Sequence, residues 1–169
     1  MKKKLPKNKN LNLCFSKRKH SHQLSQTTIL FDHIEPFILT QLKLCSSVVG
    51  CIAWLSSKKI LQQLSRLKTD LIVTSDVFSK SLKSKYRKLD SIRIIGLSRG
   101  RRRPLMHHKF LIGFNAGGKA IFALNGSYNY SEHSKHNLEN IMCIRDPNLI
   151  KPFLQEFQTL KKKSRAIRL

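Results

Sequence analysis

Three short apolar runs between residues 105 and 144 constrain the fold of this chain more than any other feature. The first run follows a His-x-Lys sequence at residues 107–109, the second ends in Gly-Ser-x-Asn at residues 126–129, and the third follows Glu139. Two glycines, at residues 117–118, separate the first run from the second, as expected for a turn between strands. Runs of this kind predict three short strands that carry an imidazole, an ammonium, a hydroxyl, an amide and a carboxylate to one end of a sheet.

Upstream of these runs, the chain alternates between helical and strand-like patterns. Helices are predicted over residues 32–44, 56–67 and 77–89, and strands over residues 46–55, 70–75 and 92–97. Such alternation predicts an α/β fold in which at least some strands pair in parallel. A last helix is expected after residue 146, and either Pro147 or Pro152 is suited to mark its start. A serine at residue 56 or 57 is a candidate N-cap for the second helix.

The charge balance is strongly one-sided. Lysine and arginine number 33 against 9 acidic residues, which gives a formal net charge of +24. Such an excess predicts a polyanionic partner, either nucleic acid or an anionic membrane surface. The alternative is a basic surface that serves solubility alone.

The chain length of 169 residues fits one domain with extensions. Residues 1–30 are predicted to form a basic, disordered arm, residues 31–164 the domain, and residues 165–169 a basic tail. No apolar core follows the basic start, so a signal peptide is not expected, whereas a mitochondrial presequence stays open. The four cysteines form no C-x-x-C pair or zinc-finger spacing, which favours reduced thiols and a cytoplasmic location.

The order of motifs between residues 105 and 144 resembles that of the phospholipase D superfamily, in particular its small single-motif nucleases. The resemblance covers roughly residues 32 to 160. In the family, four residues separate the His-x-Lys from an aspartate, and this chain has Phe114 at the position of that aspartate. Asn115 is a candidate to cap the turn that follows, because asparagine bonds its own backbone in turns. A second His-x-Lys, at residues 133–135, lies in a polar stretch and opens no strand.

The resemblance implies a mixed sheet flanked by helices and a homodimer that supplies two copies of His107 to one site. It implies a metal-independent phosphodiesterase that works through a phosphohistidine and uses no cofactor. By the same resemblance, His107 of one subunit is the nucleophile and that of the other is the general acid. Lys109 and Asn129 would hold the non-bridging oxygens, Ser127 would add a hydrogen bond, and Glu139 would orient an imidazole.

Four arginines shortly before His107 are candidates for binding substrate phosphates. They are Arg99, Arg101, Arg102 and Arg103. Guanidinium groups match phosphate oxygens geometrically, so we interpret this run as a clamp at the rim of the site. An exposed basic loop without a ligand is the alternative.

Nucleic acid, either DNA or RNA, is the expected substrate. Two other functions remain open: a phospholipase D-type hydrolase of anionic phospholipid, and a basic nucleic-acid-binding protein without catalysis. A metal site built from the histidines is disfavoured, because the spacing of residues 107, 108, 133 and 136 fits no common zinc pattern. His108 is expected to point to the opposite face of its strand from His107.

Overall fold

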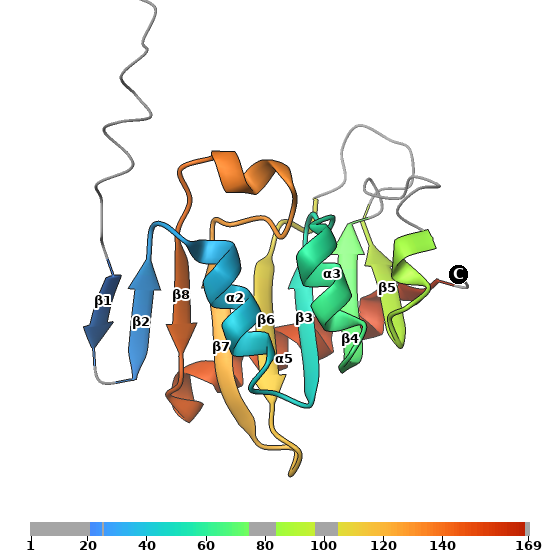
Figure 1. Cartoon of the computed structure of the whole chain (residues 1–169). Coiled ribbons are helices and arrows are strands. Elements are labelled where there is room, and N and C mark those ends of the chain that lie inside the picture. Colours follow the sequence, from blue (N-terminus) through green and yellow to red (C-terminus); the bar gives the residue numbers. More distant parts are fainter. Residues whose placement is uncertain (1–20, 25, 75–83, 97–104, 168–169) are drawn as a thin grey trace, which may run out of the picture.

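The computed structural model describes residues 21–24, 26–74, 84–96 and 105–167. Within these residues, nine strands form one mixed sheet in the order β1-β2-β8-β7-β6-β3-β4-β5-β9 (Figure 1). The strands are β1 (Ser21–Leu24), β2 (Thr27–Leu30), β3 (Ser47–Ile52), β4 (Lys68–Thr74), β5 (Ser91–Ile95), β6 (Lys109–Phe114), β7 (Ala120–Gly126), β8 (Ile141–Ile144) and β9 (Arg165–Ala166). β3, β4 and β5 pair in parallel, and the other neighbours are antiparallel. The predicted mixed α/β sheet is therefore confirmed.

Helices cover both faces of this sheet. They are α2 (Ile34–Leu42), α3 (Lys58–Leu64) and α5 (Pro147–Lys163). A short 3-10 helix, η2 (His133–His136), lies above the upper ends of the strands in Figure 1. α2 and α3 lie on one face and α5 crosses the other (Figure 1). On β6, Leu111 packs in the cluster that includes the buried residues of α2 and α3, whereas its neighbours Phe110 and Ile112 pack with α5. This division follows from the alternation of side chains along a strand.

Two helix starts agree with the local sequence signals. Ser57 caps α3, because its side chain accepts a hydrogen bond from the backbone nitrogen of Ile60 at 3.4 Å. Asp146 caps α5 by accepting from the nitrogen of Asn148 at 2.8 Å, so Pro147 is the first helical residue. Of the two prolines proposed for this start, Pro147 is correct, and Pro152 lies inside the helix.

Both described ends of the chain contain strands that the sequence did not predict. The sequence predicted a disordered arm through residue 30, but β1 and β2 extend the sheet, and β2 pairs with β8 through Leu30↔Ile141. The predicted basic tail likewise begins with β9, which pairs with β5 through Arg93↔Ala166. β2 and β9 gain backbone partners from distant parts of the chain, which no local pattern reveals. Residues 1–20 lie outside the described residues, as do residues 77–83 of the predicted 77–89 helix. Residues 84–86 are helical as predicted, whereas residues 87–89 form a turn and a bend, so the helix ends earlier than the sequence predicted.

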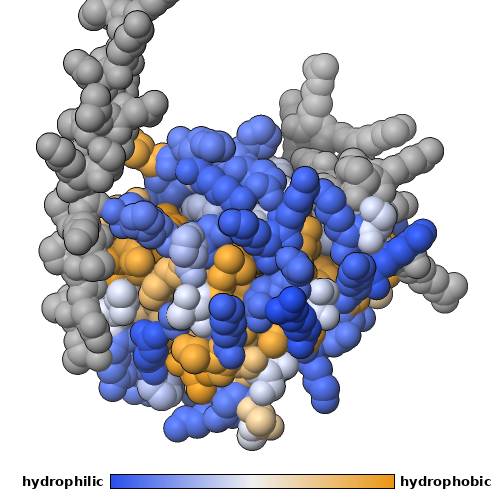
Figure 2. Space-filling model, viewed as in Figure 1, coloured by the Kyte–Doolittle hydropathy of each residue, from blue (hydrophilic) through white to orange (hydrophobic). Residues whose placement is uncertain are grey.

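The face of the domain in Figure 2 is largely hydrophilic, and the described cysteines are buried. Hydrophilic side chains cover much of the face that carries α2 and α3, with smaller apolar areas between them (Figure 2). Among the helices that the structure describes, none is both long enough and apolar enough to cross a membrane. Cys45, Cys51 and Cys143 are buried and free, as predicted.

Candidate functional site

One edge of the sheet gathers the predicted catalytic residues. β3 and β7 end at this edge and β6 and β8 begin there, because β6 is antiparallel to both β3 and β7, and β7 is antiparallel to β8. The register places Lys109 opposite Ile52 of β3, and Gly126 of β7 opposite Ile141 of β8. This edge is the upper one in Figure 1. The residues on either side of these strand ends therefore share one end of the sheet, as the sequence predicted.

His107 and Lys109 form the centre of the site. His107 is exposed, whereas Lys109 is only 7% exposed. The Lys109 Nζ lies 3.1 Å from Nδ1 and 3.2 Å from Nε2 of His107, and it donates to the His107 carbonyl oxygen at 2.9 Å. An ammonium this close to the ring nitrogens favours a neutral imidazole with a free lone pair.

Trp54 contacts both His107 and Lys109, and it was not predicted from the sequence as a site residue. Its ring makes an edge contact with His107, with ring centroids 5.0 Å apart, and the Lys109 Nζ lies 5.5 Å from the indole centroid. The backbone nitrogen of Ala53 donates a hydrogen bond to the carbonyl oxygen of His108 at 2.8 Å, and this bond holds Trp54 next to His107. Trp54 lies two residues beyond β3, so only the pairing of β3 with β6 brings it to the site. Its one signal in the sequence is that it is the single tryptophan of the chain.

The surroundings shift both titratable groups. Partial loss of water around the ring, together with the charges of Lys109 and His108, holds the pKa of His107 below its ordinary value. Burial lowers the pKa of Lys109, and the carboxylate of Glu139 opposes that shift. The shift of His107 favours a neutral imidazole, and the shift of Lys109 reflects the loss of much of the hydration of its ammonium.

Ser127 and Glu139 are joined to each other across the β7–β8 pair. The Ser127 hydroxyl donates to Glu139 Oε2, and the Asn140 side chain accepts from the Ser127 nitrogen at 3.0 Å. The Asn140 nitrogen in turn donates to Ser127 Oγ at 3.0 Å, and Asn137 donates to Glu139 Oε1 at 3.2 Å. In the described chain, the carboxylate of Glu139 is thus bonded to Ser127 and Asn137. Its orientation of an imidazole stays a prediction.

Asn129 lies at the boundary between the site and a neighbouring cavity. Its Oδ1 is buried and has no hydrogen-bond partner among the described residues. The cavity has a volume of about 300 Å³, and its walls include Trp54, Ser56, Asn129 and His133. Because Trp54 also contacts His107, the cavity adjoins the catalytic candidates.

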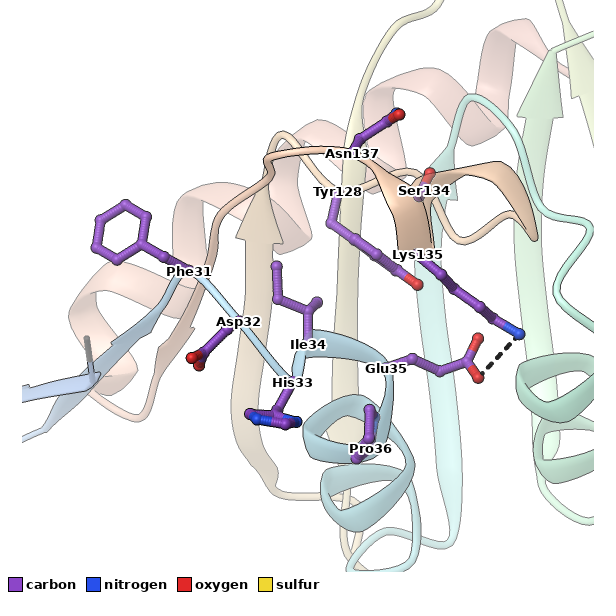
Figure 3. Close-up of a pocket in the computed structure, with 10 residues that line it drawn as sticks. All are labelled: Phe31, Asp32, His33, Ile34, Glu35, Pro36, Tyr128, Ser134, Lys135 and Asn137. Atoms are coloured by element: carbon purple, nitrogen blue, oxygen red, sulfur yellow. Dashed lines mark ion pairs between the residues drawn. The ribbon is translucent and has the colours of Figure 1, made fainter. Parts of the chain in front are cut away.

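The second His-x-Lys has a structural role. Lys135 forms ion pairs with Glu35 at 3.2 Å and with Glu132 at 2.7 Å. Glu35 is buried and accepts a second bond from Ser57 at 2.7 Å. Figure 3 shows the Lys135 and Glu35 side chains pointing toward one another across a second cavity. Lys135 therefore ties η2 to α2, and its ammonium is occupied by carboxylates.

Phe114, which stands where the family has an aspartate, lies far from the candidate catalytic residues. Phe114 ends β6 at the opposite end from His107 and is half-buried. Asn115 caps the following turn as predicted, because its Oδ1 accepts from the Lys119 nitrogen at 2.9 Å. Gly118 has a φ of 76°, a conformation that glycine adopts without strain. The turn is thus stabilised without an aspartate at residue 114.

The remaining predicted features are placed as follows. His108 points to the α5 face and contacts Glu156 at 3.1 Å, so the expected opposition to His107 is confirmed. Arg99, Arg101, Arg102 and Arg103 lie outside the described residues, and their role stays a prediction. In the part of the chain that the structure describes, no three histidine, cysteine, aspartate or glutamate side chains cluster as metal ligands would.

Comparisons with known proteins agree with this architecture. Residues 39–161 match the family model described as "Cardiolipin synthase, PLD-like domain". An uncharacterised protein of Acanthamoeba polyphaga mimivirus is 29% identical over an alignment of 203 positions. The alignment covers 92% of this chain and 72% of the viral protein.

Solved structures share the fold at low sequence identity. Nuc from Salmonella typhimurium, a phospholipase D family member, gives a TM-score of 0.71 at 15% identity, over 85% of this chain and 98% of that one. NucT from Helicobacter pylori gives a TM-score of 0.66 at 16% identity, over 84% of this chain and 99% of that one.

Proposed function

Because the chain belongs to the family of PLD-like domains, within the phospholipase D superfamily, we propose that it is a metal-independent phosphodiesterase that cleaves DNA or RNA through a phosphohistidine. The observation that carries this proposal is the contact between His107 and the buried ammonium of Lys109. A neutral imidazole is the form that attacks phosphorus, and an ammonium beside it is placed to stabilise the charge of a phosphoryl group.

The reaction has two steps. In the first, a ring nitrogen of His107 bonds to phosphorus, the bond from phosphorus to the leaving oxygen breaks, and a protonated imidazole gives that oxygen its proton. In the second, water attacks phosphorus, the phosphorus–nitrogen bond breaks, and the second imidazole takes a proton from the water. Lys109 and Asn129 bind the non-bridging oxygens during both steps, and Ser127, fixed by Glu139, adds a hydrogen bond.

The second imidazole comes, in this proposal, from His107 of another subunit. Lys135 of the other His-x-Lys in the described chain is bound to Glu35 and Glu132, so this motif offers no second ammonium–imidazole pair. A symmetric dimer places the same surface of each subunit against the other, which brings two equivalent His107 residues into one site.

Nucleic acid is the favoured substrate because of charge. A formal net charge of +24 attracts any polyanion, and a phosphodiester backbone presents many evenly spaced charges. The last turn of α5 adds Lys162 and Lys163 to the described basic surface, next to Lys161, which forms an ion pair with Asp70 at 2.6 Å.

One observation favours the lipid alternative. Leu105 and Leu138 are exposed by 37% and 72%, and each lies within two residues of a site residue in the sequence. Exposed leucines of this kind suit contact with acyl chains. Vesicles of anionic phospholipid therefore form a separate arm of the test.

The first experiment measures cleavage of labelled single- and double-stranded DNA and RNA in EDTA. We expect the wild type to cleave at least one of these substrates and His107→Ala to be inactive on it. His108→Ala is the matched control, because this neighbouring imidazole faces α5, and it should retain activity. Release of a headgroup from vesicles without nucleic-acid cleavage would support the lipid alternative, and binding without cleavage of either would support the non-catalytic one.

A second experiment tests the shared site. Wild type and His107→Ala are unfolded, mixed in equal amounts and refolded together. If each site needs two copies of His107, the mixture should have about one quarter of the activity of the same total amount of refolded wild type, because about one quarter of the dimers contain two wild-type subunits. Independent subunits should give about one half. Retention of half the activity would contradict the two-subunit scheme and leave the nuclease activity itself intact.

A further inference from the structure

The cavity beside the catalytic candidates is built from three separate parts of the chain. Trp54 and Ser56 follow β3, Asn129 and Ser131 follow β7, and His133 and Asn137 come from η2 and the residue after it. The volume is about 300 Å³, which lies at the lower end of the range for small-ligand sites. Two of its walls also belong to the site: Trp54 contacts His107, and Asn129 is a candidate phosphate ligand.

The described residues that line this cavity include no carboxylate, lysine or arginine, and most of the surface that they expose to it is apolar. They offer hydroxyl groups, amides, an imidazole and the indole of Trp54. A phosphate would find no cation among these residues, and a cation would find no anion. A flat, neutral group with donors and acceptors along its edge fits this chemistry, and a nucleobase is such a group.

The wall formed by η2 is held in place from outside. Ser134 and Asn137 line both this cavity and the one in Figure 3, so η2 separates the two. On the far side, Lys135 is fixed by the buried carboxylate of Glu35. Asn137 is fixed by its bond to Glu139. The cavity is thus largely preformed, which reduces the entropic cost of ordering its walls when a ligand binds.

We propose that this cavity is a nucleobase subsite, in which the base next to the attacked phosphate lies against Trp54. The inference rests on the proposed nuclease function and names its substrate class: nucleic acid that is single-stranded or locally unpaired. In a duplex the same base would first have to leave its stack, which costs free energy. Cleavage of single strands should therefore be faster than cleavage of the matching duplex.

The single tryptophan supplies the readout, because its fluorescence comes from the proposed subsite alone. His107→Ala, which should bind without cleaving, is titrated with a single-stranded oligonucleotide and with an abasic phosphodiester of equal length and charge. We expect the oligonucleotide to change the fluorescence and to bind about five- to one-hundred-fold more tightly, the range that base–aromatic stacking supplies. Equal affinity and equal fluorescence for the two ligands would overturn the inference.

Two variants in the His107→Ala background separate stacking from folding. Trp54→Phe keeps an aromatic face and should retain most of the preference for the base-bearing ligand, whereas Trp54→Ala should lose it; affinities are measured with a labelled ligand. Phe31→Ala is the matched control, because this exposed aromatic ring lines the cavity of Figure 3 and is not among the residues that line the proposed subsite. The preference of this variant should stay unchanged. A preference that survives in Trp54→Ala would also overturn the inference.

The test of the nucleobase subsite and the test of nuclease activity can fail separately. Cleavage in EDTA with no preference for base-bearing ligands would leave the proposed function standing and remove the subsite. A preference lost in Trp54→Ala, without cleavage of any substrate by the wild type, would support the subsite and remove the nuclease.

Discussion

Replacing Lys109 by methionine should separate catalysis from folding stability. The side chain is 7% exposed, and its Nζ lies 3.1 Å from His107 Nδ1. Methionine fills a similar volume but removes the charge and the donors. Loss of one group that stabilises developing charge typically lowers kcat by about 10²- to 10³-fold, and we expect this change in Lys109→Met. The free energy of unfolding should stay equal or rise, because a buried ammonium carries a desolvation cost that methionine does not.

The same variant should change the pH profile in a defined direction. Partial desolvation of the ring, the charge of Lys109 and that of His108 hold the pKa of His107 below its ordinary value. The nucleophile is the neutral imidazole, so kcat/KM in the wild type should fall as the pH drops through this low pKa. Without the ammonium, the pKa of His107 rises, and the acid limb of the profile should move to higher pH.

The assay is oligonucleotide cleavage in EDTA from acidic to alkaline pH, with urea unfolding in parallel. Lys119→Met is the matched control, because it removes the same charge from an exposed position at the opposite end of the β6–β7 hairpin. This control should keep both the rate and the acid limb. A Lys109→Met protein with wild-type kcat/KM, or with an unmoved acid limb, would refute the assignment of Lys109.

Two further predictions concern the framework around the site, and both are read from urea unfolding. In Gly126→Ala a Cβ atom would meet the backbone carbonyl of Asn140, so we expect a loss of about 1–3 kcal/mol. Gly117→Ala, whose Cβ would meet only a side-chain oxygen at 3.5 Å, should cost much less, and equal losses would contradict the close approach of β7 and β8. Tyr86→Phe removes a buried 2.6 Å bond to a backbone carbonyl and should cost about 1–2 kcal/mol. Tyr128→Phe removes a buried hydroxyl without a partner in the described chain and should change stability by less than about 0.5 kcal/mol; a cost equal to that of Tyr86→Phe would contradict the hydrogen-bond assignment.

Local chemistry explains what could be read from the sequence. The hairpin between β6 and β7 has a glycine-rich turn and apolar strands, and Asn115 caps that turn with its own side chain. Ser57 caps α3 through a residue three positions away. Such bonds join near neighbours, so a short window of sequence contains both partners.

Strands β2 and β9 and the position of Trp54 could not be predicted from the sequence. β2 and β9 are short, and each pairs with a strand far away in the chain. Trp54 reaches His107 only because β3 pairs with β6, across more than fifty residues of sequence. No period or motif near residue 54 encodes that pairing.

The sequence by itself determined which chemical groups lie at the ends of which strands, since strand periodicity and turn chemistry are local properties of the chain. The tertiary structure alone decided which of these groups touch. It placed the ammonium of Lys109 against His107, tied Glu139 to Ser127 and assigned Lys135 to Glu35. These contacts depend on strand register and on burial, and both are settled only when distant segments pack together.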